Sequence, residues 1–285
     1  MAKNKLNVGF IGAGNMAEAM VGAFIQSETV DATRITVCDI STERLDFFQN
    51  KFGVKIVSDN VALVQSSDIV VLSVKPQVMM TVLKEIAPCM LLPDTKKRCV
   101  ISIAAGVRLE ALESVFYNQV SEEMRSQLAL IRVMPNTPCL ALSGMSVMSA
   151  NPYATPEDIE ITRVMLASMG SVMELPETDL DAVTAMSGSG PAYVFYFLEA
   201  MIEAGKQLGL GENTATVLAC ETFKGALALM DMAGESPETL RRKVTSPGGT
   251  TEAAIRVLDQ AAVQEVFINA IRAAKERSVE LSGNA

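Results

Sequence analysis

The sequence of 285 residues predicts an α/β fold, with a doubly wound, mostly parallel sheet over residues 1–177 followed by an all-α domain over residues 178–285. Two observations carry this prediction. Short β-rich runs alternate with helical stretches through the first part, and several runs are apolar on both faces, as in a parallel sheet covered by helices. After about Thr178 no further strand-like run follows, and residues 190–282 are helical stretches rich in Ala, Met and Leu.

The strands are expected at β-rich, mostly apolar runs bounded by turn residues. In chain order these runs are KLNVGFI, RITVCD, VKIVSD, DIVVLSV, CVISIAA, LIRVMP, SGMSVMSA and GSVMEL. A well-marked helix separates the last two, because Thr155 suits an N-cap, Pro156 suits the first turn, and two acidic residues follow, as the helix dipole favours. We expect Gly170 to end that helix.

The second half is expected to consist of helices punctuated by glycines. Ser189 and Pro191 fit the N-cap and the first turn of a long helix. The helix over residues 214–233 is apolar nearly all round, so most of its surface should be buried. Because a domain of about a hundred residues cannot easily bury that much helix surface alone, a subunit interface is its expected destination.

Charge and cysteine usage exclude several classes of protein. The net charge of −9 leaves no basic surface for nucleic acid or an anionic membrane, and no apolar run is long and uncharged enough to span a bilayer. The opening residues MAKNKLNVGF run from two lysines directly into a strand-like segment, so we expect no secretory leader and a cytoplasmic protein. The five cysteines are scattered and form no CxxC pair, which predicts neither disulfides nor a metal site.

The segment VGFIGAGNMAEAM places Gly12, Gly14 and Ala17 in the spacing G-x-G-x-x-A between the first strand and the first helix. Glycines allow the tight turn and let backbone N–H groups approach a pyrophosphate at the helix N-terminus, and the alanine lets helix and strand pack closely. Since the match follows a strand, opens a helix and starts a βαβ unit, it predicts a dinucleotide site. A plain tight turn is the alternative.

Asp39 ends the second strand, where an acidic residue accepts hydrogen bonds from the adenosine ribose diol and repels a 2′-phosphate. The residue therefore favours NADH over NADPH. In the alternative interpretation Asp39 only caps the helix that begins at STERL. Arg44 lies close enough in sequence to weaken the charge argument.

Histidine is absent from the chain, which excludes an imidazole base, a histidine metal ligand and a Ser-His-Asp relay. No tyrosine is followed four residues later by lysine, and no lysine lies near SGSGPAYVFYF, so the usual proton donors for ketone reduction are missing. A C=N bond that is protonated before it binds is already electrophilic and needs positioning more than a strong acid. The missing residues therefore indicate imine reduction.

A glycine-rich stretch, TSPGGTTEAA, interrupts the helical half at residues 245–254. Pro247, Gly248 and Gly249 are expected to turn the chain, and Thr250 and Thr251 to begin the next helix. Exposed backbone N–H groups at such a helix start form a carboxylate site without any arginine, and the threonine hydroxyls add donors. An ordinary N-cap with a glycine-rich entry is the alternative.

The segment PETLRRKVTSPGGTTEAAIRVLD resembles the diagnostic segment of Δ1-pyrroline-5-carboxylate reductases, which make proline from a cyclic imino acid. VKPQ, SIAAGV, MPNTP and SGSGPAYVF stand in the order and spacing of that family, and the similarity covers essentially the whole chain. The resemblance implies an NAD(P)-binding Rossmann domain over residues 1–177 and a helical dimerisation and substrate-binding domain over residues 178–285. It also implies an interlocked homodimer, often the unit of a larger ring, with the active site between the nucleotide domain of one subunit and the helices of its partner.

The matching motifs also imply which residues bind. Dinucleotide contacts fall, beside Asp39, on Ile11, Gly12, Ala13, Gly14, Asn15, Met16, Asn60, Ser73, Val74, Lys75, Pro76, Ile103, Ala104 and Ala105. The substrate carboxylate would meet Ser246, Gly249, Thr250 and Thr251. Thr251 aligns with the threonine whose hydroxyl lies beside the ring nitrogen and is the expected catalytic residue. Lys75 is otherwise a strand-end charge, and Asn136 and Thr137 either neighbour the nicotinamide or only form a turn.

The leading function is therefore reduction of the C=N bond of L-1-pyrroline-5-carboxylate by NAD(P)H to give L-proline. A reductase of another cyclic imino acid, such as the six-membered homologue, and a non-catalytic dinucleotide-sensing oligomer are the alternatives. Many family members carry a small hydroxyl residue or a basic residue at the position of Asp39 and use NADPH well. The resemblance thus implies NAD(P)H in general, while Asp39 favours NADH with NADPH still usable.

Overall fold

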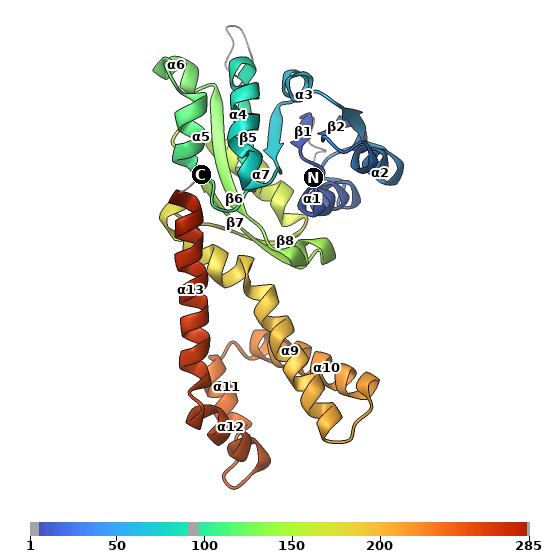
Figure 1. The fold of residues 1–285 in the computed structure, drawn as a ribbon, viewed down its shortest axis with the longest axis vertical. Coiled ribbons are helices and arrows are strands. Elements are labelled where there is room, and N and C mark those ends of the chain that lie inside the picture. Colours follow the sequence, from blue (N-terminus) through green and yellow to red (C-terminus); the bar gives the residue numbers. More distant parts are fainter. Residues whose placement is uncertain (1–5, 91–96, 284–285) are drawn as a thin grey trace. The chain divides into compact units, whose positions relative to one another are not determined.

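The computed structural model describes residues 6–90 and 97–283. Lys3 and Lys5, on which the prediction about a leader depends, lie outside the described residues. The strands are β1 (Val8–Ile11), β2 (Ile35–Cys38), β3 (Lys55–Val57), β4 (Ile69–Leu72), β5 (Arg98–Ser102), β6 (Leu128–Met134), β7 (Gly144–Ala150) and β8 (Gly170–Glu174). They form one sheet in the order β3-β2-β1-β4-β5-β6-β7-β8 (Figure 1). Every run expected to form a strand does so, and the α/β prediction is confirmed.

The sheet reverses its direction of growth at β1. From β1 the chain builds outward to β2 and β3 on one side and to β4, β5 and β6 on the other, all parallel. β7 then pairs antiparallel with β6, and β8 parallel with β7. The carboxyl ends of β1, β2, β4 and β5 therefore share one edge, with the topological switch point between β1 and β4. Ligands of doubly wound sheets bind at such a point.

Helices cover both faces of the sheet. One hydrophobic cluster packs α1 (Asn15–Gln26), α2 (Thr42–Phe52) and α7 (Pro156–Ala167) against one face, and a second packs α3 (Asn60–Ser66), α4 (Pro76–Met90) and α5 (Leu109–Phe116) against the other. Neighbouring residues of β5 divide between the clusters, since Ile101 belongs to the first and Val100 to the second. This is why the central strands are apolar on both faces.

α7 begins as predicted but ends earlier. The Thr155 hydroxyl accepts from the Asp158 N–H, and the Asp158 carboxylate accepts from the Thr155 N–H, which together form a capping box. The prediction that Gly170 ends this helix is wrong, because the helix ends at Ala167 and Ser168 is its C-cap. Gly170 instead opens β8 with a φ of +141°, where a Cβ would collide with the Gly144 carbonyl oxygen.

The chain beyond Thr178 is helical, as predicted. After α6 (Glu122–Arg125) in the first part, the helices are α8 (Leu180–Val183), α9 (Gly190–Gln207), α10 (Glu212–Ala233), α11 (Pro237–Lys243), α12 (Thr250–Gln260) and α13 (Val263–Gly283). The chain divides into two compact units, one comprising residues 190–273 and the other the rest, including the end of α13 from Ala274.

The start of α9 differs from the prediction. A π-helical turn, Thr184–Gly188, follows α8, and the Ser189 N–H donates to the Thr184 carbonyl oxygen across it. The backbone before α9 is therefore already helical, so Ser189 is not an N-cap with extended backbone conformation. Pro191 lies in the first turn of α9, as expected.

Within residues 190–273, α9 and α10 lie side by side (Figure 1). They approach closely at Gly205, where a Cβ would lie 2.7 Å from the Ala215 Cβ. The Tyr193 and Phe197 rings of α9 contact the Phe267 ring of α13 edge to face, at centroid distances of 5.7 and 5.4 Å. No helix of the described residues has both the length and the apolar character needed to cross a membrane.

The helical unit buries little of its apolar surface in a single chain. Ala215 and Ala219 are its buried hydrophobic residues, whereas Val217, Leu227 and Met232 of α10 are 60%, 58% and 80% exposed. The burial predicted for residues 214–233 is therefore not reached within one chain. Apolar exposure on this scale is typical of an interaction surface.

Candidate active site

The glycine turn after β1 is held where β1 passes β4. Gly12 has a φ of +103°, and a Cβ there would lie 2.7 Å from the Ser73 carbonyl oxygen, so no larger residue fits. Ser73 follows β4; its N–H donates to the Ile11 carbonyl oxygen at 2.9 Å and its hydroxyl to the Gly12 carbonyl oxygen at 2.7 Å. The predicted cofactor residues of these two turns are thus brought together at the switch point.

Gly14 has the opposite surroundings. It is the exposed N-cap of α1, with φ −75° and ψ −178°, and nothing lies within 4 Å of where its Cβ would be. No side chain caps this helix start. The N–H groups of Asn15 and Met16 belong to the first turn, which lacks intrahelical acceptors and lies at the positive end of the helix dipole. An anion can therefore approach the backbone here, as a dinucleotide pyrophosphate requires.

Asp39 is bonded to the glycine turn. Its Oδ2 accepts from the Ala13 N–H at 2.6 Å, and its Oδ1 accepts from the Ser41 N–H at 2.8 Å. The Ser41 hydroxyl caps α2 by accepting from the Arg44 N–H. The alternative in which Asp39 itself caps this helix is therefore wrong.

Arg44 is held by α1 and the glycine turn. Its Nε donates to the Ala13 carbonyl oxygen at 2.8 Å, and its Nη2 lies 2.9 Å from Glu18 Oε2. Glu18 also pairs with Lys51 at 2.8 Å. Burial opposes ionisation of Glu18, but the hydrogen bonds from Lys51 and Arg44 hold the pKa of its carboxyl below the usual value. The guanidinium is thus committed to partners of its own chain.

The residues predicted from VKPQ lie at the entry of α4. Val74 and Lys75 connect β4 to Pro76, the first residue of α4, and the Lys75 side chain is exposed. The Lys75 carbonyl oxygen accepts from the Val78 N–H. The structure therefore places these residues next to Ser73 at the same edge of the sheet.

Two further cofactor candidates flank this turn. Asn60 is the first residue of α3, and its Nδ2 donates to Glu85 Oε2 at 2.9 Å. The amide nitrogen of the side chain therefore already has a partner within the chain. Ile103, Ala104 and Ala105 follow β5, and the Ile103 N–H donates to the Leu72 carbonyl oxygen at 3.1 Å. β5 neighbours β4, so this loop lies at the edge that carries the glycine turn.

The MPNTP motif forms a turn in which Asn136 has a structural role. Its Oδ1 accepts from the Met145 N–H at 2.9 Å, and its Nδ2 donates to the Ser187 carbonyl oxygen at 3.1 Å. Both ends of the amide are used to join β7 to the π-helical turn. The interpretation of Asn136 as a turn residue therefore accounts for its contacts.

The sheet edge carries no strong general acid among these residues. Cys38 ends β2 beside Asp39, and burial, followed by the negative charge of Asp39, raises the pKa of its thiol to about 11. The thiol thus stays protonated at neutral pH and is 4% exposed.

The glycine-rich stretch forms the predicted helix entry. Gly248 has a φ of +74°, Gly249 is the N-cap, and α12 begins at Thr250. The Gly249 N–H donates to the Ser246 carbonyl oxygen at 3.0 Å, so the turn itself uses this predicted carboxylate donor. The N–H groups of Thr250 and Thr251 open the helix and lack intrahelical acceptors. They are the donors that remain for a carboxylate.

Glu252 is a member of this helix entry that the sequence interpretation missed. Its Oε2 accepts from the Gly248 N–H at 2.9 Å and lies 3.8 Å from the Arg256 guanidinium. The hydrogen bond joins the first turn of α12 to Gly248, which has a left-handed backbone conformation. The sequence could have indicated this role, because Glu252 follows a glycine-rich turn by a few residues and helix N-termini favour negative side chains.

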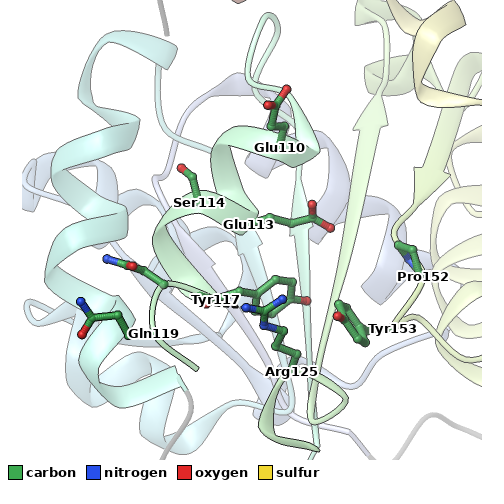
Figure 2. A pocket seen from close by; sticks show the side chains of 9 residues that line it. Glu110, Glu113, Ser114, Tyr117, Gln119, Arg125, Pro152 and Tyr153 are labelled. Carbon is green, nitrogen blue, oxygen red and sulfur yellow. Dashed lines mark hydrogen bonds between the residues drawn. The ribbon is translucent and has the colours of Figure 1, made fainter. Parts of the chain in front are cut away.

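A separate hollow lies away from these turns (Figure 2). Tyr117 forms its floor, where the hydroxyl donates to the Leu128 carbonyl oxygen at the amino end of β6 and burial raises the pKa of the phenol. The Tyr153 ring packs edge to face on Tyr117, and Arg125 lies over the same ring. The hollow is therefore at the strand end opposite to the glycine turn and belongs to no predicted site.

Fold and turns together define the class of protein: a nucleotide-dependent oxidoreductase with a Rossmann domain and a separate helical domain. A family model described as "Pyrroline-5-carboxylate reductase dimerisation" matches residues 177–281, and one described as "NADP oxidoreductase coenzyme F420-dependent" matches residues 7–106. The chain belongs to the pyrroline-5-carboxylate reductase family.

Full-length relatives carry this assignment. The chain is 39% identical to a pyrroline-5-carboxylate reductase from Corynebacterium melassecola over 96% of this chain and 98% of that protein. A pyrroline-5-carboxylate reductase structure from Coxiella burnetii is 38% identical and has a TM-score of 0.86. The match covers 98% of this chain and 99% of that one. The Plasmodium falciparum structure, which has NADP bound, is 28% identical with a TM-score of 0.86, over 99% of this chain and 100% of that one.

Proposed function

We propose that this protein reduces the C=N bond of L-1-pyrroline-5-carboxylate with NAD(P)H and releases L-proline. The observation that carries the proposal is the helix entry after Gly249, where the N–H groups of Thr250 and Thr251 remain for a carboxylate. Family membership and a glycine turn built for a dinucleotide support it. When bound, NAD(P)H supplies the hydride.

The turns at the switch point fit the dinucleotide. We assign the pyrophosphate to the backbone of Gly14, Asn15 and Met16, because Gly14 leaves open space where a side chain would stand. Ile11, Gly12 and Ala13 shape this turn. The other contacts are proposed at Asn60, Ser73, Val74, Lys75, Pro76, Ile103, Ala104 and Ala105, all at helix starts or loops after strands.

The substrate half of the proposal concerns the start of α12. The carboxylate would bind the N–H groups of Thr250 and Thr251, with the Ser246 hydroxyl and the Gly249 backbone beside it. Only glycine or another small residue allows such an approach to the main chain. The Thr251 hydroxyl would lie beside the ring nitrogen, where it can accept from the protonated imine and later face the product amine. Hydride transfer requires this loop and the nicotinamide to meet in the assembled enzyme.

The chemistry needs no strong acid. A protonated C=N carbon is electron-poor before hydride arrives, and the product nitrogen keeps its proton. What the protein must supply is orientation and a polar surrounding fixed in advance, which lowers the barrier without proton transfer from a side chain. A chain without histidine can do this.

We also propose that NADH is preferred and NADPH is usable. The Asp39 carboxylate lies next to the glycine turn, and its charge disfavours a 2′-phosphate. Arg44 is bonded to Glu18 and Ala13 and so is not available as the phosphate's counter-ion. Ile40, whose side chain is fully exposed, is offered as an apolar contact for the adenine ring.

We propose that the working unit is a cytoplasmic homodimer joined through the C-terminal helices, and that such dimers are the unit of a larger ring. The exposed apolar side chains of α10 support this, because water contact with such a face is unfavourable. We retain residues 1–177 and 178–285 as the proposed cofactor-binding and dimerisation domains. Analytical ultracentrifugation at several concentrations measures the subunit number directly.

A steady-state assay at 340 nm with synthetic pyrroline carboxylate and each nucleotide tests the activity. The proposal predicts oxidation of NADH and of NADPH coupled to proline formation. Because one methylene is worth only about 1–3 kcal/mol in a pocket, some turnover of the six-membered imine is expected, with a lower kcat/KM. A higher kcat/KM for the six-membered ring would favour the alternative imine reductase. Nucleotide binding without turnover of either ring would favour a sensing oligomer.

A further inference from the structure

A buried arginine belongs to β6, the strand that neighbours β5 at the point where the loop after β5 begins. Arg132 belongs to β6, where its neighbours along the strand are apolar, and its side chain is 2% exposed. Its Nη1 lies 3.1 Å from Oε1 of Glu177, which is partly exposed. Arg132 is in register with Ser102, the last residue of β5. The backbone of Arg132 is therefore paired with the last residue of the strand from which the loop departs.

The Glu177 carboxylate connects this arginine to the end of the loop. The same Oε1 accepts from the Leu109 N–H at 2.6 Å, and Leu109 is the first residue of α5. The preceding residue, Arg108, pairs through Nη2 with Asp181 Oδ2 at 3.2 Å. The N-cap and the first residue of α5, Arg108 and Leu109, are thus bonded to carboxylates from the segment 177–181.

The end of α13 approaches the loop at Gly106. A Cβ on Gly106, whose φ is +78°, would lie 3.4 Å from the Leu281 Cβ. The Ser278 hydroxyl donates to Asp181 Oδ1 at 2.7 Å, and the Ser282 hydroxyl to the same atom at 3.3 Å. These contacts belong to one compact unit, since the end of α13 packs with the sheet domain.

Stability alone is a poor explanation for this arrangement. An ion pair that buries a charge is often no more stabilising than well-packed hydrophobic residues of similar volume, and here the Arg132 guanidinium loses its hydration while Glu177 stays partly exposed. Here the cost is higher still, since Arg132 Nη2 and the Ser102 hydroxyl are buried without a hydrogen-bond partner among the described residues. What the pair does accomplish is to fix one carboxylate oxygen at the Leu109 amide.

We propose that Arg132 and Glu177 are positioning residues that hold the loop Ile103–Gly106 in the shape that receives the dinucleotide. Neither residue touches the cofactor; Arg132 acts by orienting Glu177, and Glu177 acts by fixing the amide at which the loop enters α5. The inference rests on the proposed function insofar as this loop contacts NAD(P)H. It adds two residues that the family resemblance did not indicate.

The test compares KM values for NADH and for the imino acid in a graded series of variants. Glu177→Leu removes the acceptor and should raise the KM for NADH at least tenfold while the KM for the imino acid stays within twofold. Glu177→Gln keeps an acceptor oxygen for Leu109 and should recover most of the loss. Arg132→Met should resemble Glu177→Leu, and the double variant should be no worse than Glu177→Leu, because both act through one contact.

Arg98→Met is the matched control. Arg98 is also a buried arginine on a strand, but its Nη1 donates to the Cys89 and Met90 carbonyl oxygens at the end of α4. This variant should lower the melting temperature and leave the KM for NADH within twofold. The inference is overturned if Glu177→Leu folds with an unchanged KM for NADH, or if Arg98→Met raises that KM equally. Should wild-type protein fail to oxidise NADH with the imino acid, the proposed function fails instead. Direct NADH titration of the same variants then decides the positioning role.

Discussion

Substituting the two glycines of the first turn separates folding from nucleotide binding. Gly12→Ala would put a Cβ 2.7 Å from the Ser73 carbonyl oxygen at a φ of +103°. A left-handed backbone costs an L-residue about 1–2 kcal/mol, and overpacking a tight contact adds about 1–3 kcal/mol. We therefore expect Gly12→Ala to lose about 2–5 kcal/mol of stability, a large fraction of the 5–15 kcal/mol of a typical protein.

Gly14→Ala is the matched substitution two residues away. Its backbone, with φ −75° and ψ −178°, is ordinary for alanine, and the new Cβ meets no atom within 4 Å. The loss of stability should stay below about 1 kcal/mol, the scale of an N-cap change. Affinity for NADH should nevertheless fall at least tenfold, because the Cβ stands where the pyrophosphate approaches the helix start.

Urea denaturation at a fixed protein concentration measures the first effect, since subunit association shifts apparent stability. NADH fluorescence titration measures the second. An unchanged urea midpoint for Gly12→Ala would refute the steric argument. Wild-type NADH affinity in Gly14→Ala would refute the position assigned to the pyrophosphate.

Three further predictions concern single side chains. Thr251→Ala should lower kcat about 10- to 100-fold, the worth of a hydrogen bond to a charged group, and change NADH affinity little; an unaltered kcat would remove the hydroxyl from the mechanism. Asp39→Ser should raise kcat/KM for NADPH relative to NADH at least about fivefold, since like charges 4 Å apart repel by about 1 kcal/mol even in bulk water; a constant ratio would leave Asp39 only its bonds to the Ala13 and Ser41 N–H groups. Burial opposes ionisation of Asp181, but the Ser278 hydroxyl and the charges of Arg132 and Arg108 hold the pKa of its carboxyl below the ordinary value of 3.8. Ionised Asp181 therefore stabilises the fold above pH 3.8, and this stabilisation is lost as pH falls through the lowered pKa. The melting temperatures of wild type and Asp181→Asn should therefore differ most near neutral pH and converge in acid; a constant difference would contradict this.

The strands could be predicted because each is a short apolar run between turn residues, and because a strand covered on both faces, like Ile69–Leu72, is apolar throughout. The shape of the turn after β1 could also be predicted, since Gly12 and Gly14 have backbone conformations and surroundings that their spacing indicates. The start of α12 followed from Gly249 and Thr250 for the same reason.

Contacts between residues far apart in sequence could not be predicted from the sequence. The bonds from Glu177 to Arg132 and Leu109 join residues 45 and 68 positions apart, and no local pattern specifies such partners. An arginine inside the apolar run LALIRVM was a sign of the buried charge at Arg132. For Asn136 the sequence left two interpretations open, and its contacts fit the turn, because its Oδ1 accepts from the Met145 N–H and its Nδ2 donates to the Ser187 carbonyl oxygen.

A crystal structure of the enzyme with L-proline and oxidised nucleotide tests the central claim most directly. The account predicts a carboxylate oxygen within about 2.7–3.2 Å of the Thr250 or Thr251 amide nitrogen, with the Thr251 hydroxyl beside the ring nitrogen. Proline bound away from the start of α12, with those amides facing only solvent, would contradict it.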